Sequence, residues 1–260
     1  MSVAVRVNWV SDGPDDGAIV LFSGSLGSDV RMWEPQVTAL TDAGYRVIRY
    51  DHRGHGGSPV PRGPYSLDDL GGDVLELLNL LNARRVHFAG LSLGGMVGMW
   101  LAENSPERLS TLTLCCTSAD LGPASGWAER AALVRKQGTQ AVAEAVVSRW
   151  FTPGWAEANP GRITFFREMV AAIPAEGYAS CCTAIEQMDI LDRLETIPTP
   201  TLVIAGAEDP ATPPYHGKLI AETVQQGRLA IVSPGAHLAS AERPGEVNQL
   251  ILEHIRSAHG

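Results

Sequence analysis

The sequence predicts an α/β protein in which a mostly parallel sheet is flanked by helices and interrupted by an all-helical insertion. Three observations predict it: short apolar runs, segments of helical period between most of them, and one long stretch that has helical segments only. Short apolar runs are typical of strands buried on both faces, and strands that alternate with helices favour a parallel sheet with right-handed crossovers. The chain has 260 residues, of which 45% are hydrophobic, so it can bury a full core.

The expected strands are the apolar runs at residues 18–22, 46–50, 86–90, 110–116, 200–206 and 228–233. The segments between most of these runs have a helical pattern. Residues 70–82, for example, place Val74, Leu77, Leu78 and Leu81 on one stripe, which predicts a helix packed against the sheet.

The alternation of strand and helix breaks between residues 121 and 195. Four segments of helical pattern follow one another there without an apolar run between them, at residues 127–137, 139–151, 162–173 and 177–188. Turn-rich stretches, LGPASG and IPTP, flank this region. We therefore expect one core built from residues 1–120 and 196–260, with a helical insertion at residues 121–195.

The charge of the chain argues against two classes of partner. The formal net charge is -9 and the sequence pI is about 5.2, and no run of Lys and Arg occurs, so neither nucleic acid nor an anionic membrane surface is expected to bind. The N-terminal segment lacks the pattern of a signal peptide, and no stretch of about 18 apolar residues could span a bilayer. These observations predict a cytoplasmic protein with a small-molecule partner, and they leave its oligomeric state open.

The cysteines fall in two adjacent pairs, Cys115-Cys116 and Cys181-Cys182. Neighbours in sequence rarely satisfy the geometry of a disulfide or the two-residue spacing of a zinc site. We expect reduced, partly buried thiols and no metal site.

Ser92 lies at the centre of the motif Gly90-Leu91-Ser92-Leu93-Gly94, between a predicted strand and a predicted helix. Glycines at these positions remove side chains that would collide in a sharp strand-to-helix turn. Such a turn projects the serine hydroxyl at the carboxyl edge of the sheet, so Ser92 is the candidate nucleophile. The alternative is a glycine-rich bend with an incidental serine.

A serine hydroxyl needs a base and an orienting acid to become a nucleophile, and both follow in the chain order Ser, Asp, His. Asp209 comes just after the strand at 200–206, and His237 lies in the loop after the last strand. Both therefore lie at the same sheet edge as Ser92. His237 would accept the serine proton, and Asp209 would orient the imidazole and stabilise its charged form.

Other acids and histidines of the sequence fit these roles less well. Asp120 is the alternative acid, Asp51 also follows a strand, and Glu208 is expected to point elsewhere. The remaining histidines lack the placement of His237: His52 and His55 are expected to be structural, His87 begins a strand, and His216, His254 and His259 are expected at helix or tail surfaces.

Two backbone amides are needed to stabilise a tetrahedral intermediate. The amide of Leu93 is the first, because it follows the nucleophile at the start of a helix. The second should come from the glycine-rich loop FSGSLGSD, where Leu26 is the candidate and Ser25 the alternative.

Seven segments resemble those of a known family. They are LFSGSLGSDVRMWEPQ, YRVIRYDHRGHGGSPVPRGPYSLDDLGGDV, HFAGLSLGGMVGMWLA, WFTP, GYASCCTAIEQMD, PTLVIAGAEDPATPP and GAHLASAERP. They are similar to segments of the α/β-hydrolases and, more narrowly, of the 3-oxoadipate enol-lactonases. The resemblance runs through nearly the whole chain, helical insertion included. One departure is Gly24-Ser25, which replaces the usual His-Gly of the first loop.

This resemblance implies that the insertion forms a cap over the site and that Ser92, Asp209 and His237 are the catalytic triad. It implies an enzyme that opens an enol-lactone to 3-oxoadipate through an acyl-enzyme, without a cofactor. Gln187 stands where a basic side chain is usual, which points to an altered substrate preference.

The implied substrate carries a free carboxylate, so an acidic protein needs a local cation to hold it. Candidate contacts are Arg31 beside the oxyanion loop, Arg130 in the insertion, Trp127 as an apolar wall, and Ser25. A solvated arginine or a packing tryptophan explains these residues equally well. Two other functions stay open: a carboxylesterase or lactonase acting on another ester in specialised metabolism, and a non-catalytic binding protein.

Overall fold

The computed structural model describes residues 3–258, and at its centre is a seven-stranded sheet with the order β1-β3-β2-β4-β5-β6-β7. β1 pairs antiparallel with β3, and all other neighbouring strands pair in parallel. The strands are β1 (Trp9–Asp12), β2 (Ile19–Ser23), β3 (Arg46–Tyr50), β4 (Val86–Leu91), β5 (Leu109–Cys115), β6 (Thr201–Gly206) and β7 (Gly227–Val232). This arrangement confirms the predicted α/β class and each of the six predicted strands.

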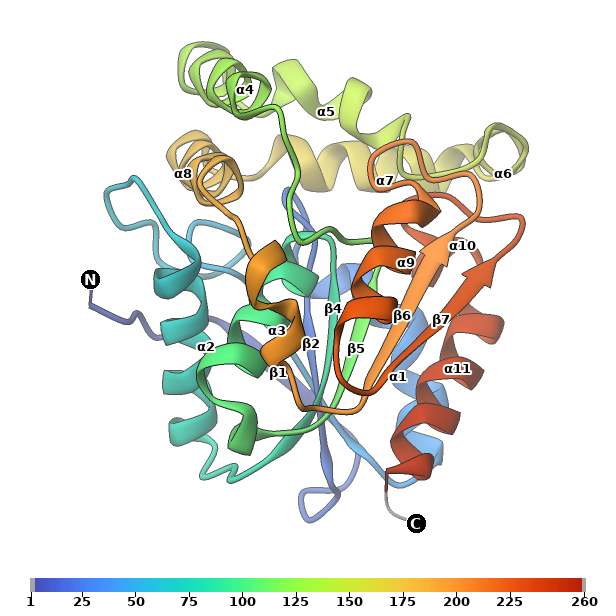
Figure 1. Ribbon diagram of the computed structural model, residues 1–260. Helices are drawn as coiled ribbons and strands as arrows, with labels where there is room; N and C mark the ends of the chain where they lie inside the picture. Colours follow the sequence, from blue (N-terminus) through green and yellow to red (C-terminus); the bar gives the residue numbers. More distant parts are fainter. Residues whose placement is uncertain (1–2, 259–260) are drawn as a thin grey trace.

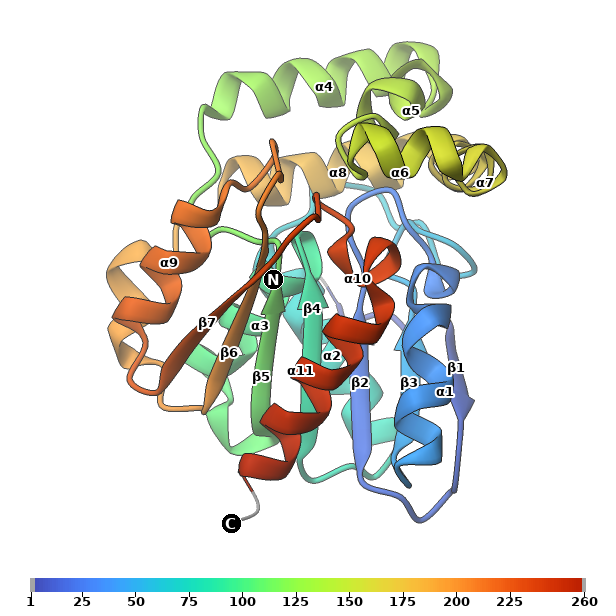
Figure 2. The same ribbon diagram turned by 90° about the vertical axis from the view of Figure 1, so that its right-hand side faces the viewer.

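Helices cover both faces of the sheet. α2 and α3 lie on one face, and α1 and α11 lie on the other (Figures 1 and 2). The bounds of the core helices are α1 (Glu34–Asp42), α2 (Leu67–Leu80), α3 (Leu93–Asn104), α9 (Pro214–Thr223), α10 (Ala239–Glu242) and α11 (Pro244–Ser257). α2 begins at a capping box, because the Ser66 side chain accepts from the Asp69 amide and the Asp69 carboxylate accepts from the Ser66 amide.

The helical insertion stands above the carboxyl ends of the strands (Figures 1 and 2). It consists of α4 (Ala124–Gln137), α5 (Gln140–Val147), α6 (Pro153–Ala158), α7 (Pro160–Ala171) and α8 (Ala175–Glu186), and in the described chain no strand lies between β5 and β6. We propose that residues 121–195 are the cap and that residues 1–120 and 196–260 are the core. Ligands bind at the carboxyl edge of parallel sheets, so the cap covers the expected site.

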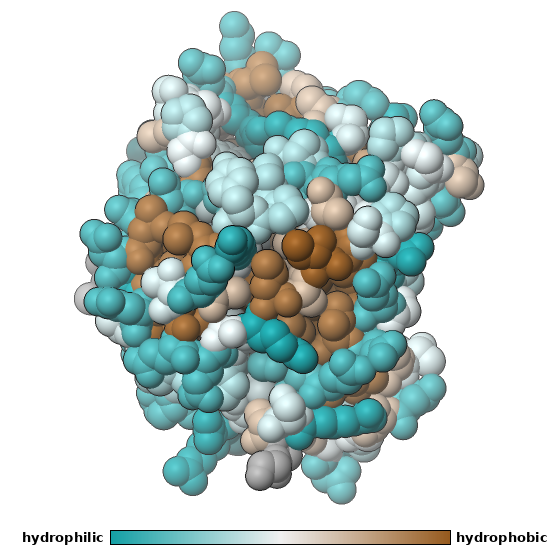
Figure 3. All heavy atoms as spheres, turned by 45° about the vertical axis from the view of Figure 1, so that its right-hand side comes forward, coloured by the Kyte–Doolittle hydropathy of each residue, from teal (hydrophilic) through white to brown (hydrophobic). Residues whose placement is uncertain are grey.

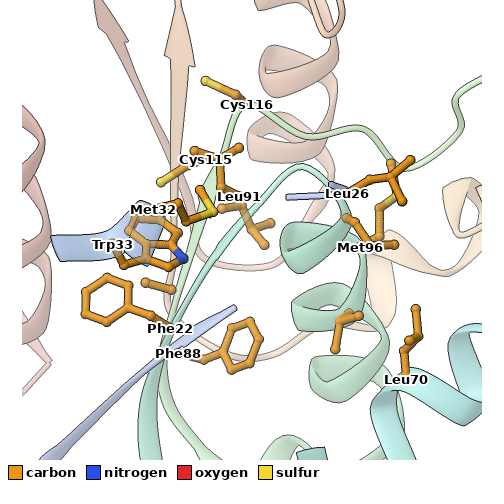
Figure 4. Packing of buried hydrophobic residues seen from close by; sticks show 14 of the residues in the cluster. Phe22, Leu26, Met32, Trp33, Leu70, Phe88, Leu91, Met96, Cys115 and Cys116 are labelled. Atoms are coloured by element: carbon orange, nitrogen blue, oxygen red, sulfur yellow. The ribbon is translucent and has the colours of Figure 1, made fainter. Parts of the chain in front are cut away.

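The sheet and the helices beside it enclose one hydrophobic core (Figure 4). Phe22 and Trp33 pack there with their ring centroids 4.6 Å apart. All four cysteines are free thiols, and they are fully buried rather than partly buried as expected. On the face shown in Figure 3, the apolar side chains form patches that polar side chains interrupt. Among the described residues, no helix is both long and apolar enough to cross a bilayer.

Four details differ from the sequence-based expectations. β1 and α6 were not predicted, because both are short and β1 has the half-exposed residues of an edge strand. β7 is not buried on both faces: it is the other edge strand, and Ile231 in it is 51% exposed. His254 is buried rather than on the surface, with its Nε2 3.2 Å from the carbonyl oxygens of Leu112 and Pro200. His259 lies outside the described residues.

Candidate active site

Ser92 occupies the turn between β4 and α3 in a conformation that side chains rarely adopt. Its φ is 55° and its ψ is -113°. Such strain persists only where neighbours hold the residue in place. The Ser92 amide donates to the Cys115 carbonyl at 2.9 Å, and the Ser92 carbonyl accepts from Thr117 Oγ1 at 2.7 Å. The strand-to-helix turn that the motif predicted is therefore present and braced on both sides.

The glycines of the motif are required by close backbone contacts. A Cβ atom on Gly90 would lie 2.2 Å from the Gly94 carbonyl oxygen, and one on Gly94 would lie 2.2 Å from the Ser23 carbonyl oxygen. Because no side chain fits at either position, the turn can bring α3 close to the end of β2. The first turn of α3 thereby meets the loop that follows β2.

Asp209 and His237 contact each other, although they come from different loops. His237 Nδ1 lies 2.8 Å from Asp209 Oδ2, and the two residues are only 4% and 3% exposed. The Asp209 carboxylate also accepts hydrogen bonds from the amides of Ala211 and Thr212 and from Thr212 Oγ1. Because Nδ1 contacts the Asp209 carboxylate, the other ring nitrogen, Nε2, is available to accept a proton.

The charge of Asp209 is stabilised by these partners. Burial raises the pKa of Asp209, but the His237 imidazole and the Thr212 hydrogen bonds outweigh burial and lower it below its ordinary 3.8. Asp209 therefore stays ionised at neutral pH, and an acid limb in a pH–rate profile would belong to another group.

The loop that carries His237 is held partly by the cap. The Leu238 amide donates to the Trp150 carbonyl at 2.8 Å, and the Ala236 amide donates to Glu242 Oε2 at 3.0 Å. The Glu242 carboxylate in turn accepts from the backbone amide and the hydroxyl of Thr152. The sequence offered no signal for the contact between Glu242 and the cap, because Thr152 lies 90 residues away along the chain.

The structure separates Asp209 from the other acids weighed for its role. Asp120 and Glu208 are exposed. Asp51 is buried, but its carboxylate accepts from the amides of Val30 and Gly57 and from the Asn8 side chain. Only Asp209 of these acids contacts His237 within the described chain.

Two backbone amides near Ser92 are the candidates for the oxyanion hole. Leu93 is the first residue of α3, and the first N–H groups of a helix have no intrahelical acceptor. In the loop after β2, the Ser25 carbonyl accepts from the amide and hydroxyl of Ser28, at 3.1 and 2.7 Å. In a trans peptide the following N–H points the opposite way, so the Leu26 amide points away from Ser28.

The amide of Ser25 is already engaged, because it donates to Met32 Sδ at 3.3 Å. Leu26 lines the same cavity as Ser92. This geometry favours Leu26 over Ser25 as the second donor, together with Leu93.

A cavity of about 310 Å³ lies between the cap and the sheet edge. Ser92 and His237 line it from the core, and Trp127 and Arg130 line it from α4. Trp127 is fixed there because its Nε1 donates to the Leu121 carbonyl at 2.7 Å, and the Arg130 guanidinium lies 4.6 Å from its ring centroid. The cavity thus brings together the predicted nucleophile, base, apolar wall and cap arginine, along with Ser25 and Leu26.

Arg31 does not belong to this group, which corrects the expectation for it. Its guanidinium is paired with Asp29 at 2.6 Å, its side chain is 47% exposed, and it does not line the cavity. The guanidinium also lies 5.1 Å from the Phe165 ring centroid. The residue follows the oxyanion loop in sequence, but in the short 3-10 helix Val30–Trp33 its side chain lies against Asp29 rather than in the cavity.

Arg149 is the cation that sequence reasoning missed. It follows α5, is half-buried and lines the cavity with Arg130, and the described lining residues include no Asp or Glu. Burial and then the charge of Arg130 lower the pKa of Arg149 below its ordinary value. Two arginines that share one cavity without an acid make it a favourable place for an anion.

The chain is similar over nearly its whole length to proteins with known names. The profile of the family described as alpha/beta hydrolase fold matches residues 17–244. The 3-oxoadipate enol-lactonase 2 of Acinetobacter baylyi is 40% identical over 247 residues, which are 95% of this chain and 92% of that protein.

Two solved structures are similar throughout. The enol-lactonase of Burkholderia xenovorans LB400 is 36% identical, with a TM-score of 0.93 and 96% of each chain covered. A malate-bound thermophilic esterase of Thermogutta terrifontis is 30% identical, with a TM-score of 0.93 and coverage of 98% of this chain and 95% of that one.

Proposed function

This chain belongs to the alpha/beta-hydrolase family and is a carboxylic ester hydrolase, and on that premise we propose that it opens 3-oxoadipate enol-lactone to 3-oxoadipate. The observation that carries the proposal is the shared cavity, which has Ser92 and His237 on its floor and two arginines in its roof. A lactone that bears a carboxylate is complementary to both parts, because its ring carbonyl can react with Ser92 and its carboxylate can pair with the arginines.

The reaction follows from the placement of each group. Ser92 Oγ attacks the lactone carbonyl while its proton passes to His237, whose charged form Asp209 stabilises. The amides of Leu26 and Leu93 hold the oxyanion of the tetrahedral intermediate. The ring C–O bond then breaks, and the enolate oxygen, which remains part of the acyl-enzyme, takes the proton from His237.

A water molecule completes the cycle. His237 removes a proton from this water as it attacks the acyl-enzyme, and the proton then returns to Ser92 as the acid is released. The freed enol becomes the ketone of 3-oxoadipate. An enolate leaves far more easily than an alkoxide, so breaking the ring C–O bond needs little help from protonation of the leaving oxygen by His237.

The first test compares two kinds of substrate. We expect kcat/KM for 3-oxoadipate enol-lactone to exceed that for neutral aryl esters of similar size by about 100-fold, since an enzyme gains selectivity from groups that pair in the transition state. Spectrophotometric rates on both substrates measure this ratio. Faster turnover of the neutral esters would reject the lactonase proposal and favour the alternative esterase function.

The arginines are tested separately. We expect Arg130→Gln and Arg149→Gln each to raise KM for the lactone by about 10- to 100-fold, because hydrogen bonds to charged groups contribute about 1.5–3 kcal/mol. Turnover of a neutral ester should change little. The matched control is Arg31→Gln, which alters an exposed arginine outside the cavity. An unchanged KM in either cavity variant would remove that arginine from the binding site.

A serine-directed phosphonate separates both enzyme functions from the non-catalytic one. We expect one label per chain, on Ser92, with complete loss of activity. A protein that binds ligands without catalysis would not react, because its serine would not be activated.

A further inference from the structure

Two buried histidines that the catalytic scheme does not use lie against the loop that carries Leu26. His52 Nε2 lies 3.0 Å from the Gly24 carbonyl oxygen, and the Gly27 amide donates to His55 Nε2 at 3.0 Å. Both side chains are at most 2% exposed. The imidazoles therefore hold the two ends of the loop, one on each side of the Ser25–Leu26 peptide.

The two imidazoles must be neutral and in opposite tautomers. A carbonyl only accepts, so His52 carries its proton on Nε2. The Gly27 amide only donates, so His55 has a bare Nε2 and carries its proton on Nδ1, which lies 3.4 Å from the Arg53 carbonyl. Burial lowers the pKa of His52 to about 4 and that of His55 to about 3, so both stay neutral at neutral pH.

His52 also connects the loop to the nucleophile turn. The Gly24 carbonyl accepts from His52 and, at 3.0 Å, from the Gly94 amide in the first turn of α3. Gly94 follows Leu93, the other candidate donor of the oxyanion hole. One carbonyl oxygen thus ties the loop of Leu26 to the helix of Leu93.

His55 also contacts a residue that lines the cavity. Its ring stacks on that of Tyr178 in α8, with centroids 6.5 Å apart, and Tyr178 lines the cavity. The ring of His55 also meets that of His52 edge-on, with centroids 6.1 Å apart. The pair therefore forms a packed support between the loop and the cap.

We propose that His52 and His55 are positioning residues that set the direction and spacing of the Leu26 and Leu93 amides, and so control how well the oxyanion is held. They act through the backbone and do not touch the substrate. The inference rests on the proposed function only in requiring an oxyanion hole, so any ester that the enzyme hydrolyses can test it.

The experiment compares His55→Leu with His55→Gln. Leucine removes the acceptor for the Gly27 amide, whereas glutamine can place an oxygen near the position of Nε2. We expect His55→Leu to lower kcat by about 10- to 100-fold with KM nearly unchanged, which is less than the 10²–10³-fold cost of losing a donor outright. His55→Gln should recover most of kcat.

Two further measurements separate positioning from stability. His254→Leu is the matched control, because His254 is a buried histidine bonded to carbonyl oxygens in the core away from the cavity, and we expect it to lower stability but not kcat per folded molecule. Binding of an aryl boronic acid, which mimics the tetrahedral state, should weaken in His55→Leu in proportion to kcat.

Three outcomes would overturn the proposal: equal kcat in His55→Leu and wild type per folded molecule, no recovery in His55→Gln, or unchanged boronate affinity. If His55→Leu does not fold, the pair His52→Met and His52→Gln gives the same comparison, because glutamine retains an N–H for the Gly24 carbonyl. The proposed function has a separate test, since it fails if Ser92 does not react with a phosphonate, whatever the histidine variants do.

Discussion

Ser92→Ala is expected to lower kcat on every ester and lactone substrate by about 10⁴- to 10⁶-fold. Of the two serines among the described lining residues, Ser92 is the one in the strand-to-helix turn, so the variant would retain only what binding and the oxyanion hole contribute. Stopped assays at high enzyme concentration measure the residual rate. The fold should be unaffected, because alanine adopts the strained backbone of Ser92 at a cost similar to that of serine.

The control for this variant is Ser148→Ala, which changes an exposed serine in the cap. We expect it to match the wild-type protein in both rate and thermal stability. Mass spectrometry after phosphonate treatment should show a label in the control and none in Ser92→Ala. If Ser92→Ala kept more than a tenth of the wild-type turnover, the acyl-enzyme mechanism would be wrong.

The second large effect is expected for Asp209→Asn. The oxygen of asparagine can still accept from the amides of Ala211 and Thr212, so its NH₂ group would turn toward His237 Nδ1. Nδ1 must then accept, and the proton moves to Nε2, which can no longer act as a base. We expect kcat to fall by about 10⁴-fold with little change in KM, as a wrong tautomer produces in a serine triad.

Asp120→Asn is the matched comparison, because Asp120 was the alternative acid and is exposed. It should keep kcat within about twofold of wild type, in line with the small effects of surface substitutions. The steady-state constants of both variants decide the assignment. A large loss in Asp120→Asn together with a small one in Asp209→Asn would transfer the orienting role to Asp120.

The strands and most helices could be predicted because their signals are local. The apolar run at 86–90 and the glycines around Ser92 specify a strand, a sharp turn and a helix among residues that are neighbours in the chain. β1 escaped prediction because an edge strand needs fewer apolar residues than a central one. α6 escaped because it has only six residues.

The contacts that tune the site could not be predicted in the same way. Arg31 and Arg149 carry the same charge, but Arg31 is paired with the nearby Asp29, whereas Arg149 lines the cavity because of how the cap packs over the core. Glu242 likewise holds residues 90 positions away, through its bonds to Thr152. No periodicity or motif records such pairings.

By itself the sequence determined the fold class, the chain order of Ser92, Asp209 and His237, and their common place at the carboxyl edge of the sheet. These follow from hydrophobic patterning and turn chemistry, which act between near neighbours. Only the tertiary structure decided which cations line the cavity, that the Ser25 amide is already engaged, and which tautomers of His52 and His55 fit their hydrogen bonds. The tautomers depend on hydrogen bonds between residues 28 positions apart, and the cavity lining joins residues from separate segments, so both exist only once the chain has packed.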